Sequence, residues 1–98
     1  MNDYLFLMYN DTVEPIDVAA WGPYFAGLRA AGRFEGGSAI GSGVSVRKDK
    51  PALPITANLG GYIRVTADSL DHARALVAGN PVYEAGGTVE IRELPRTD

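Results

Sequence analysis

The sequence contains no cysteine, which excludes disulfide bonds, thiolate catalysis and zinc–thiolate sites. It has no run of Lys or Arg, and its net charge of −3 argues against the basic surface that nucleic acid requires. No apolar stretch approaches the ~20 residues that span a bilayer, and no secretory signal pattern is present. We therefore expect a cytoplasmic protein that binds neither nucleic acid nor membrane.

The remaining composition is that of an ordinary globular protein, with 46% hydrophobic and 21% charged residues. The 98 residues are enough for one core, so we expect a single domain over residues 1–98. A metal site needs three or four His, Cys or carboxylate ligands, and the sequence gathers no such set. We accordingly expect no metal and no cofactor.

The opening stretch, residues 4–9, carries six large apolar or aromatic side chains and no charge. A strand sends alternate side chains to opposite faces. The two sets are Leu5, Leu7 and Tyr9 on one face and Tyr4, Phe6 and Met8 on the other. Because both faces are apolar, the pattern predicts a strand in the middle of a sheet, covered on both sides.

Residues 16–31 have the spacing of a helix. The apolar stripe at i, i+3, i+4 and i+7 consists of Trp21, Tyr24, Phe25 and Leu28. Pro23 cannot donate a hydrogen bond to the carbonyl of Ala19, so the helix either bends at Pro23 or begins there with Pro23 in its first turn. Gly32 is expected to end it.

The middle of the chain, residues 33–61, is rich in glycine and reads as irregular. It is expected to hold a short strand at 34–40 and a hairpin in which Val44–Arg47 pairs with Ile55–Thr56 across a turn at 49–51. A further strand is predicted at 59–66.

The last third predicts a helix capped by Asp68 and ended at 79–81, followed by a strand at 88–94. Four residues, Leu70, Ala73, Leu76 and Val77, form the expected buried stripe of this helix. The element order favours an α+β, ferredoxin-like split βαβ fold: an antiparallel sheet with two helices on one face and an extra β-hairpin. One face of the sheet then stays uncovered, so we expect a homodimer whose sheets pack face to face.

The chain resembles the YCII-related family, including its DGPF-type branch. The resemblance rests on the apolar strand that ends in Tyr9, on residues 28–33, on Leu59-Gly60-Gly61-Tyr62, and above all on residues 80–86 followed by Val89-Glu90-Ile91-Arg92. It implies a dimeric α+β barrel that covers nearly the whole chain.

The same resemblance argues against a simple catalytic role. Several family members carry a His on the first helix and an Asp before the Pro after the second, a pair taken as an acid–base site. Those positions here are Trp21 and Asn80, which can neither relay a proton nor act as a carboxylate base. The DGPF motif is replaced by residues 53–58.

His72, the only histidine, lies one helical turn after Asp68 but off the apolar stripe, which favours a solvated surface side chain. Arg64, Glu90 and Arg92 occupy outward strand positions and are read either as cross-strand ion pairs or as the polar lining of a site for a small anion.

Three functions remain open. The first is a homodimeric binding protein with a small-molecule pocket between the first helix and the sheet. Its candidate ligand-binding residues are Tyr9, Trp21, Tyr24, Tyr62 and Asn80. The second is an enzyme that acts on a small aromatic or carbonyl compound, with Tyr24, Tyr62 or His72 as the proton donor. The third is a regulatory or interaction role, which the resemblance allows.

Overall fold

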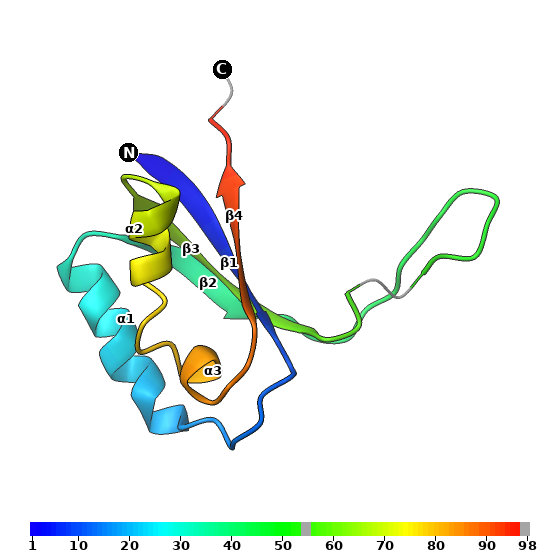
Figure 1. The fold of residues 1–98 in the computed structure, drawn as a ribbon. Coiled ribbons are helices and arrows are strands. Elements are labelled where there is room, and N and C mark those ends of the chain that lie inside the picture. The colour runs from blue at the N-terminus through cyan, green and yellow to red at the C-terminus, as the bar shows by residue number, and fades with distance from the viewer. Residues whose placement is uncertain (54–55, 97–98) are drawn as a thin grey trace.

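The computed structural model describes residues 1–53 and 56–96. Its elements are β1 (Asn2–Tyr9), the 3-10 helix η1 (Val18–Ala20), α1 (Trp21–Ala30), β2 (Phe34–Ala39), β3 (Leu59–Ala67), α2 (Leu70–Ala75), α3 (Pro81–Glu84) and β4 (Val89–Leu94). The strands form one antiparallel sheet in the order β2-β3-β1-β4, and the helices lie together on one of its faces (Figure 1). The predicted ferredoxin-like α+β architecture is confirmed.

The opening strand lies inside the sheet as predicted, with β3 on one side and β4 on the other. The side chains of Tyr4, Phe6 and Met8 face the helices and are buried, with Phe6 completely inaccessible. The odd-numbered side chains of Leu5, Leu7 and Tyr9 are only half-buried, because no helix covers that face. We call this second surface the open face.

The α-helix begins at Trp21, which is the predicted alternative with Pro23 in the first turn, and residues 18–20 of the helical pattern form a 3-10 turn. The reason is Pro23, which has no N–H to offer the carbonyl of Ala19. At the third helical position that missing donor costs nothing, since the first turn leaves its N–H groups unpaired in any case. Gly32 ends the helix with φ +70°, as expected, while the N–H of Arg33 donates to the carbonyl of Leu28 at 2.9 Å.

The prediction that Asp68 caps the second helix is wrong. Ser69 is the cap, and its hydroxyl accepts a hydrogen bond from the N–H of His72 at 3.1 Å. The Asp68 carboxylate instead lies 3.7 Å from the guanidinium of Arg33. The buried stripe of α2 is also shorter than predicted, because Leu70 at the first helical position is 52% exposed.

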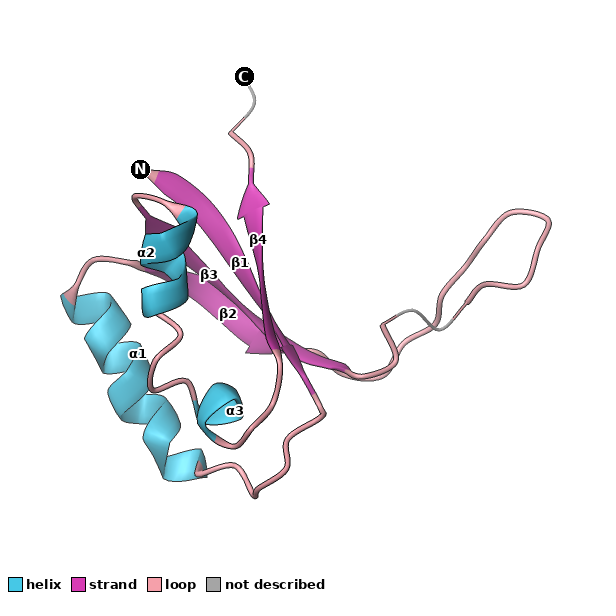
Figure 2. Ribbon diagram, in the orientation of Figure 1, coloured by secondary structure: helices cyan, strands magenta, loops and turns pink. Residues whose placement is uncertain are grey.

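The segment between β2 and β3 departs most from expectation. Its described residues, 40–53 and 56–58, contain no strand, so the predicted strand at Val44–Arg47 is wrong; Ile55 lies outside the described residues. A turn does lie at residues 48–50, with Asp49 at φ +64°. The described part of this segment projects away from the sheet as an arm (Figures 1 and 2).

The arm explains why the chain is more extended than a compact domain. The radius of gyration is 14.7 Å, against about 13 Å for a compact domain of this length. Val44 and Val46 on the arm are 88% and 89% exposed, so no packing within the chain holds them. None of the helices in the described ranges is long and apolar enough to cross a membrane.

A carboxylate fixes the loops at one end of β1 and β4. Asp11 accepts hydrogen bonds from the N–H of Thr88 at 2.7 Å and from its hydroxyl at 2.5 Å. These bonds lower the pKa of Asp11, the bond to the hydroxyl most of all. A depressed carboxyl pKa contributes stability that is present above the unfolded-state pKa of about 3.9 and is lost as pH falls through the folded-state value.

We therefore expect Asp11→Asn to lower the free energy of unfolding at pH 7 and to flatten its decline between pH 5 and pH 2. Urea unfolding at fixed protein concentration across that range measures both effects. Thr88→Ala, which removes only the hydroxyl partner, should show the same trend at smaller amplitude. An unchanged acid profile in Asp11→Asn would show that this carboxylate does not contribute to acid unfolding.

Candidate functional site

A cavity of about 570 Å³ lies between α1 and the end of the sheet formed by β1, β2 and β3. This is the position that the sequence predicted for a pocket, and the volume is within the range of small-molecule sites. Its walls combine α1 side chains with sheet residues, and they are mainly apolar: Met8, Trp21, Phe25, Phe34, Ile63 and Val82.

Stacked aromatic rings form the α1 side of the cavity. Trp21 and Phe25 lie one helical turn apart, so their side chains are neighbours on the same face of α1. Their ring centroids are 5.4 Å apart with an interplanar angle of 20°. The ring centroid of Phe25 also lies 5.1 Å from that of Phe34 in β2. Such a cluster presents flat apolar surface to a ligand with little loss of side-chain freedom.

Glycines form the opposite side. Gly36 has φ +112°, and the register between β2 and β3 shifts between Phe34 and Gly37, so β2 contains a bulge at the cavity. A β-carbon on Gly61 would lie 3.2 Å from the Met8 methyl carbon, and one on Gly37 would lie 2.6 Å from the carbonyl oxygen of Tyr62. Glycine at these two positions therefore allows β2 and β3 to pack this closely against each other and against Met8, because a larger residue would clash.

Of the five residues singled out from the sequence, Trp21 lines this cavity from α1. Tyr9 and Tyr62 border it from strand positions whose side chains point to the open face. The hydroxyl of Tyr9 donates a hydrogen bond of 2.6 Å to the carboxylate of Glu90. That bond raises the pKa of Tyr9, so the phenol stays protonated at neutral pH.

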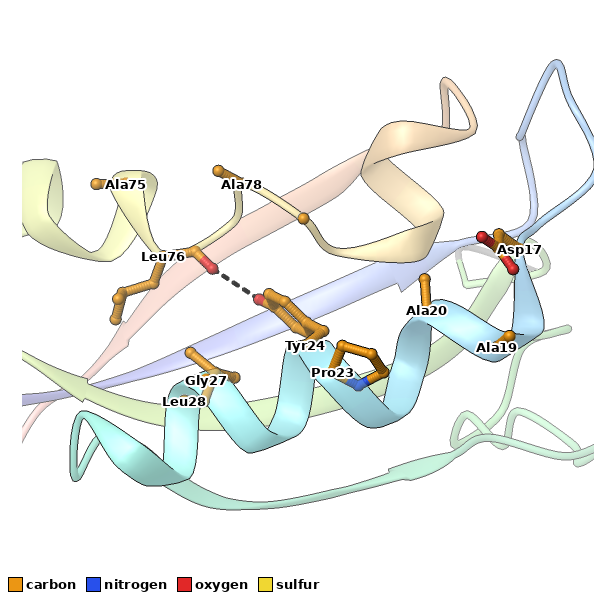
Figure 3. A pocket seen from close by; sticks show the side chains of 11 residues that line it. Asp17, Ala19, Ala20, Pro23, Tyr24, Gly27, Leu28, Ala75, Leu76 and Ala78 are labelled. Carbon is orange, nitrogen blue, oxygen red and sulfur yellow. Dashed lines mark hydrogen bonds between the residues drawn. The ribbon is translucent and has the colours of Figure 1, made fainter.

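Tyr24 lies on a different surface, a groove of about 660 Å³ between α1 and the end of α2 (Figure 3). Its hydroxyl donates a hydrogen bond of 2.7 Å to the carbonyl oxygen of Leu76, and burial raises the pKa of Tyr24 to about 12. This groove is lined largely by small side chains, Ala19, Ala20, Gly27, Ala75, Ala78 and Gly79. It offers few groups that could recognise a ligand, so we place the candidate site in the aromatic cavity.

The Tyr24 hydrogen bond joins α1 to the end of α2, and we expect Tyr24→Phe to reduce the free energy of unfolding by about 1 kcal/mol. Chemical denaturation measures this loss. Tyr83→Phe is the matched control, because Tyr83 is 52% exposed and should change stability by less than about 0.5 kcal/mol. Equal effects in the two variants would contradict a stabilising role for the Tyr24 bond.

Asn80 is fully buried and does not line the cavity. Its side-chain oxygen caps α3 by accepting from the N–H groups of Val82 at 2.9 Å and Tyr83 at 3.2 Å. Its amide nitrogen lies 3.4 Å from the sulfur of Met8, a cavity residue. Asn80 therefore contacts the cavity wall through Met8 without lining the cavity itself.

The remaining polar candidates lie elsewhere. The Nδ1 atom of His72 accepts a hydrogen bond from the backbone N–H of Asp68 at 3.0 Å, at the start of α2. Arg64 of β3 pairs with Asp3 of β1 at 3.8 Å, which is the predicted kind of cross-strand ion pair, whereas Arg92 pairs with Glu90 of the same strand at 3.6 Å. Within residues 1–53 and 56–96, no three His, Cys, Asp or Glu side chains lie close enough to hold a metal ion.

Sequence reasoning overlooked Arg29 and the two glycine pairs. Arg29 lines the cavity and continues the i, i+4 spacing of Trp21 and Phe25 by one more turn, so that spacing was a usable signal. Gly36-Gly37 was interpreted as a weak point of a strand, and Gly60-Gly61 was used only as part of the family resemblance. Both pairs line the cavity from β2 and β3, where Gly37 pairs with Ile63 and Gly61 with Ala39, and the sequence alone does not reveal this register.

The sequence matches no protein-family model and no curated protein. The fold is similar to that of a solved structure, 5-chloro-2-hydroxyhydroquinone dehydrochlorinase (TftG) from Burkholderia phenoliruptrix AC1100, in complex with 2,5-dihydroxybenzoquinone. The TM-score is 0.57 at 14% sequence identity, and the match covers 97% of this chain and 95% of that one. At this level of identity the two chains share a fold.

Proposed function

We propose that this chain is a homodimeric small-molecule-binding protein of the YCII-related type, with its ligand held between α1 and the sheet. The observation that carries the proposal is the cavity of about 570 Å³ with the stacked Trp21–Phe25 pair in its wall. Aromatic walls with a few polar groups are typical of small-molecule sites. The stacked rings favour a ligand with a flat ring, and the ring compound bound by the dehydrochlorinase supports that choice.

Trp21 makes the binding site directly observable, because it is the only tryptophan in the chain. A panel of single-ring and fused-ring aromatic compounds should contain members that raise the melting temperature, since a ligand that binds only the folded state stabilises it. The same compounds should change Trp21 fluorescence with saturable curves. The matched control is Ala78→Arg, which obstructs the groove between α1 and α2 and should leave these titrations unchanged.

Loss of the response in Ala78→Arg would place the ligand in that groove instead. If no compound in the panel produced either a thermal shift or a saturable change in fluorescence, the binding proposal would be refuted.

The open face supports the homodimer. Leu5 and Leu7 form an apolar centre there, and the ion pairs Arg64–Asp3 and Arg92–Glu90 lie around it. An apolar centre with a polar rim is the usual anatomy of a protein interface. The exposed Val44 and Val46 on the arm provide further apolar surface that a second copy would cover.

A second candidate function, an enzyme acting on a ring compound, is favoured by the likeness to a dehydrochlorinase. Of the three proton donors considered from the sequence, Tyr62 is the one that borders the cavity, although its side chain points to the open face beside its strand partner Leu7. Tyr24 lies in the other groove, and His72 lies within α2, where its Nδ1 accepts from the N–H of Asp68. Binding without turnover of the compound by the wild type, followed by chromatography, would favour the first function. Turnover that is lost in Tyr62→Phe while binding persists would favour the second.

A further inference from the structure

We infer that the ligand of the cavity is an aromatic anion, a planar ring bearing a carboxylate or an equally acidic oxygen, and that Arg29 binds its negative charge. This inference rests on the proposed function and specifies its ligand class.

The charge of the cavity wall is the first observation that supports an anionic ligand. Among the described residues that line the cavity, Arg29 is the one with a formal charge, and none is acidic. The chain as a whole carries a net charge of −3, so a positive charge without neighbouring carboxylates is not a general property of the surface. The field inside the cavity therefore favours an anion over a neutral or cationic ligand.

The geometry of Arg29 carries the second step. The guanidinium carbon lies 4.9 Å from the ring centroid of Phe34 and 5.9 Å from that of Phe25. These contacts hold the group over the aromatic cluster. Arg33 and Arg96 each pair with a carboxylate. For Arg29 there is no such hydrogen bond or ion pair within residues 1–53 and 56–96, so its N–H donors remain available.

The chemistry of the two groups then defines the ligand. A guanidinium presents its donors in a planar fork that matches the two oxygens of a carboxylate. Trp21, Phe25 and Arg29 follow one another at one-turn intervals along α1, so they present a stacking surface that leads to a cation. A flat ring with an anionic oxygen at its edge matches that order, because the ring can stack while its edge meets the guanidinium.

Arg29 could instead have a purely structural role, in which it only covers the rings of Phe25 and Phe34 through its aliphatic stem and cation–π contacts. The two roles differ in one measurable property. A packing residue affects all ligands alike, whereas an anion-binding residue discriminates between ligands of equal shape and unequal charge.

The test uses 2-naphthoate and 2-naphthamide, which share a ring system and differ in charge, with dissociation constants from isothermal titration calorimetry. We expect the wild type to bind the naphthoate at least about tenfold more tightly, the size of one good charge-assisted contact. Arg29→Gln should remove that preference while leaving the affinity for the naphthamide nearly unchanged. Arg29→Lys, which keeps the charge and loses the fork, should retain part of it.

Arg74→Gln is the matched control, because Arg74 is an exposed arginine of α2 that does not line the cavity. It should bind both compounds as the wild type does, and thermal melts confirm that all variants are folded at the temperature of the titration. If Arg29→Gln weakened both compounds equally, or if the wild type showed no preference, the anion inference would be overturned while the binding function stood. If neither compound bound the wild type, the anion inference would be overturned, and the titrations with the aromatic panel would decide the binding function separately.

Discussion

Replacing Leu7 with glutamate is expected to convert the proposed homodimer into a monomer at micromolar concentration. Leu7 lies in the middle of β1, pairs with Tyr62 of β3 and Glu90 of β4, and faces the open side of the sheet. In a dimer with two-fold symmetry each copy contributes the same residue, so one substitution buries two carboxylates. An unpaired buried charge costs several kcal/mol, which corresponds to at least about a hundredfold weaker dimerisation.

Sedimentation equilibrium or light scattering coupled to size-exclusion chromatography measures this change. The fold itself should survive, because Leu7 is half-buried in the single chain and its side chain does not enter the core under the helices. Ala26→Glu is the matched control: it adds the same charge on the exposed side of α1 and should leave the dimer intact. A wild type that is monomeric, or a Leu7→Glu variant that still dimerises, would refute packing through the open face.

The arm can be tested with the same measurement. Val44→Ser combined with Val46→Ser removes apolar side chains that are almost fully exposed in the single chain, so it should not affect folding. If the arm lies against the second copy, the dimer should dissociate at higher concentration than the wild type does. An unchanged dissociation constant would restrict the interface to the sheet.

The sheet could be predicted from the sequence because its signal is local. Two apolar faces on residues 4–9 place that strand at the centre, and alternation in residues 59–66 and 88–94 identifies the neighbouring strands. The end of α1 could also be predicted, since glycine adopts the left-handed conformation seen at Gly32, φ +70°, more readily than other residues do. In these regions the local preference and the tertiary structure agree.

The arm could not be predicted, because alternating apolar residues at 44–47 have the pattern of a strand whether or not a partner strand is present. The prediction of the N-cap of α2 was wrong for a similar reason. Asp68 and Ser69 are both good N-caps, and the choice depends on Arg33, which lies 35 positions away in the sequence and pairs with Asp68. Contacts of this kind are not visible in local spacing.

The candidate site was partly predictable. Trp21 could be singled out because it is an aromatic residue with a polar N–H on the apolar face of the first helix, and it lines the cavity. Arg29 did not stand out, because an arginine near the end of a helix is usually explained by the helix dipole. Its position over Phe34 depends on how β2 bulges at Gly36, and that geometry follows from the assembled sheet.

Asn80→Ala is expected to lower the free energy of unfolding by about 2–4 kcal/mol, the largest stability loss we expect from a polar residue of this chain. Asn80 is 0% exposed, and its oxygen accepts from the N–H groups of Val82 and Tyr83. Alanine would leave both donors without their acceptor, and the N–H of Val82 is buried, which adds a desolvation cost to the lost cap. Chemical denaturation at fixed protein concentration measures the loss.

Asn80→Asp distinguishes the effect of the capping oxygen from the effect of the amide nitrogen. Aspartate keeps an acceptor for both N–H groups, so it should be more stable than Asn80→Ala. Both variants lose the amide nitrogen that contacts the sulfur of Met8, and Met8 lines the cavity. Both should therefore bind aromatic ligands more weakly than the wild type, whatever their difference in stability. Equal stability of the two variants would show that the buried amide matters more than the cap, and unchanged ligand affinity in both would show that Asn80 does not hold the cavity wall in place.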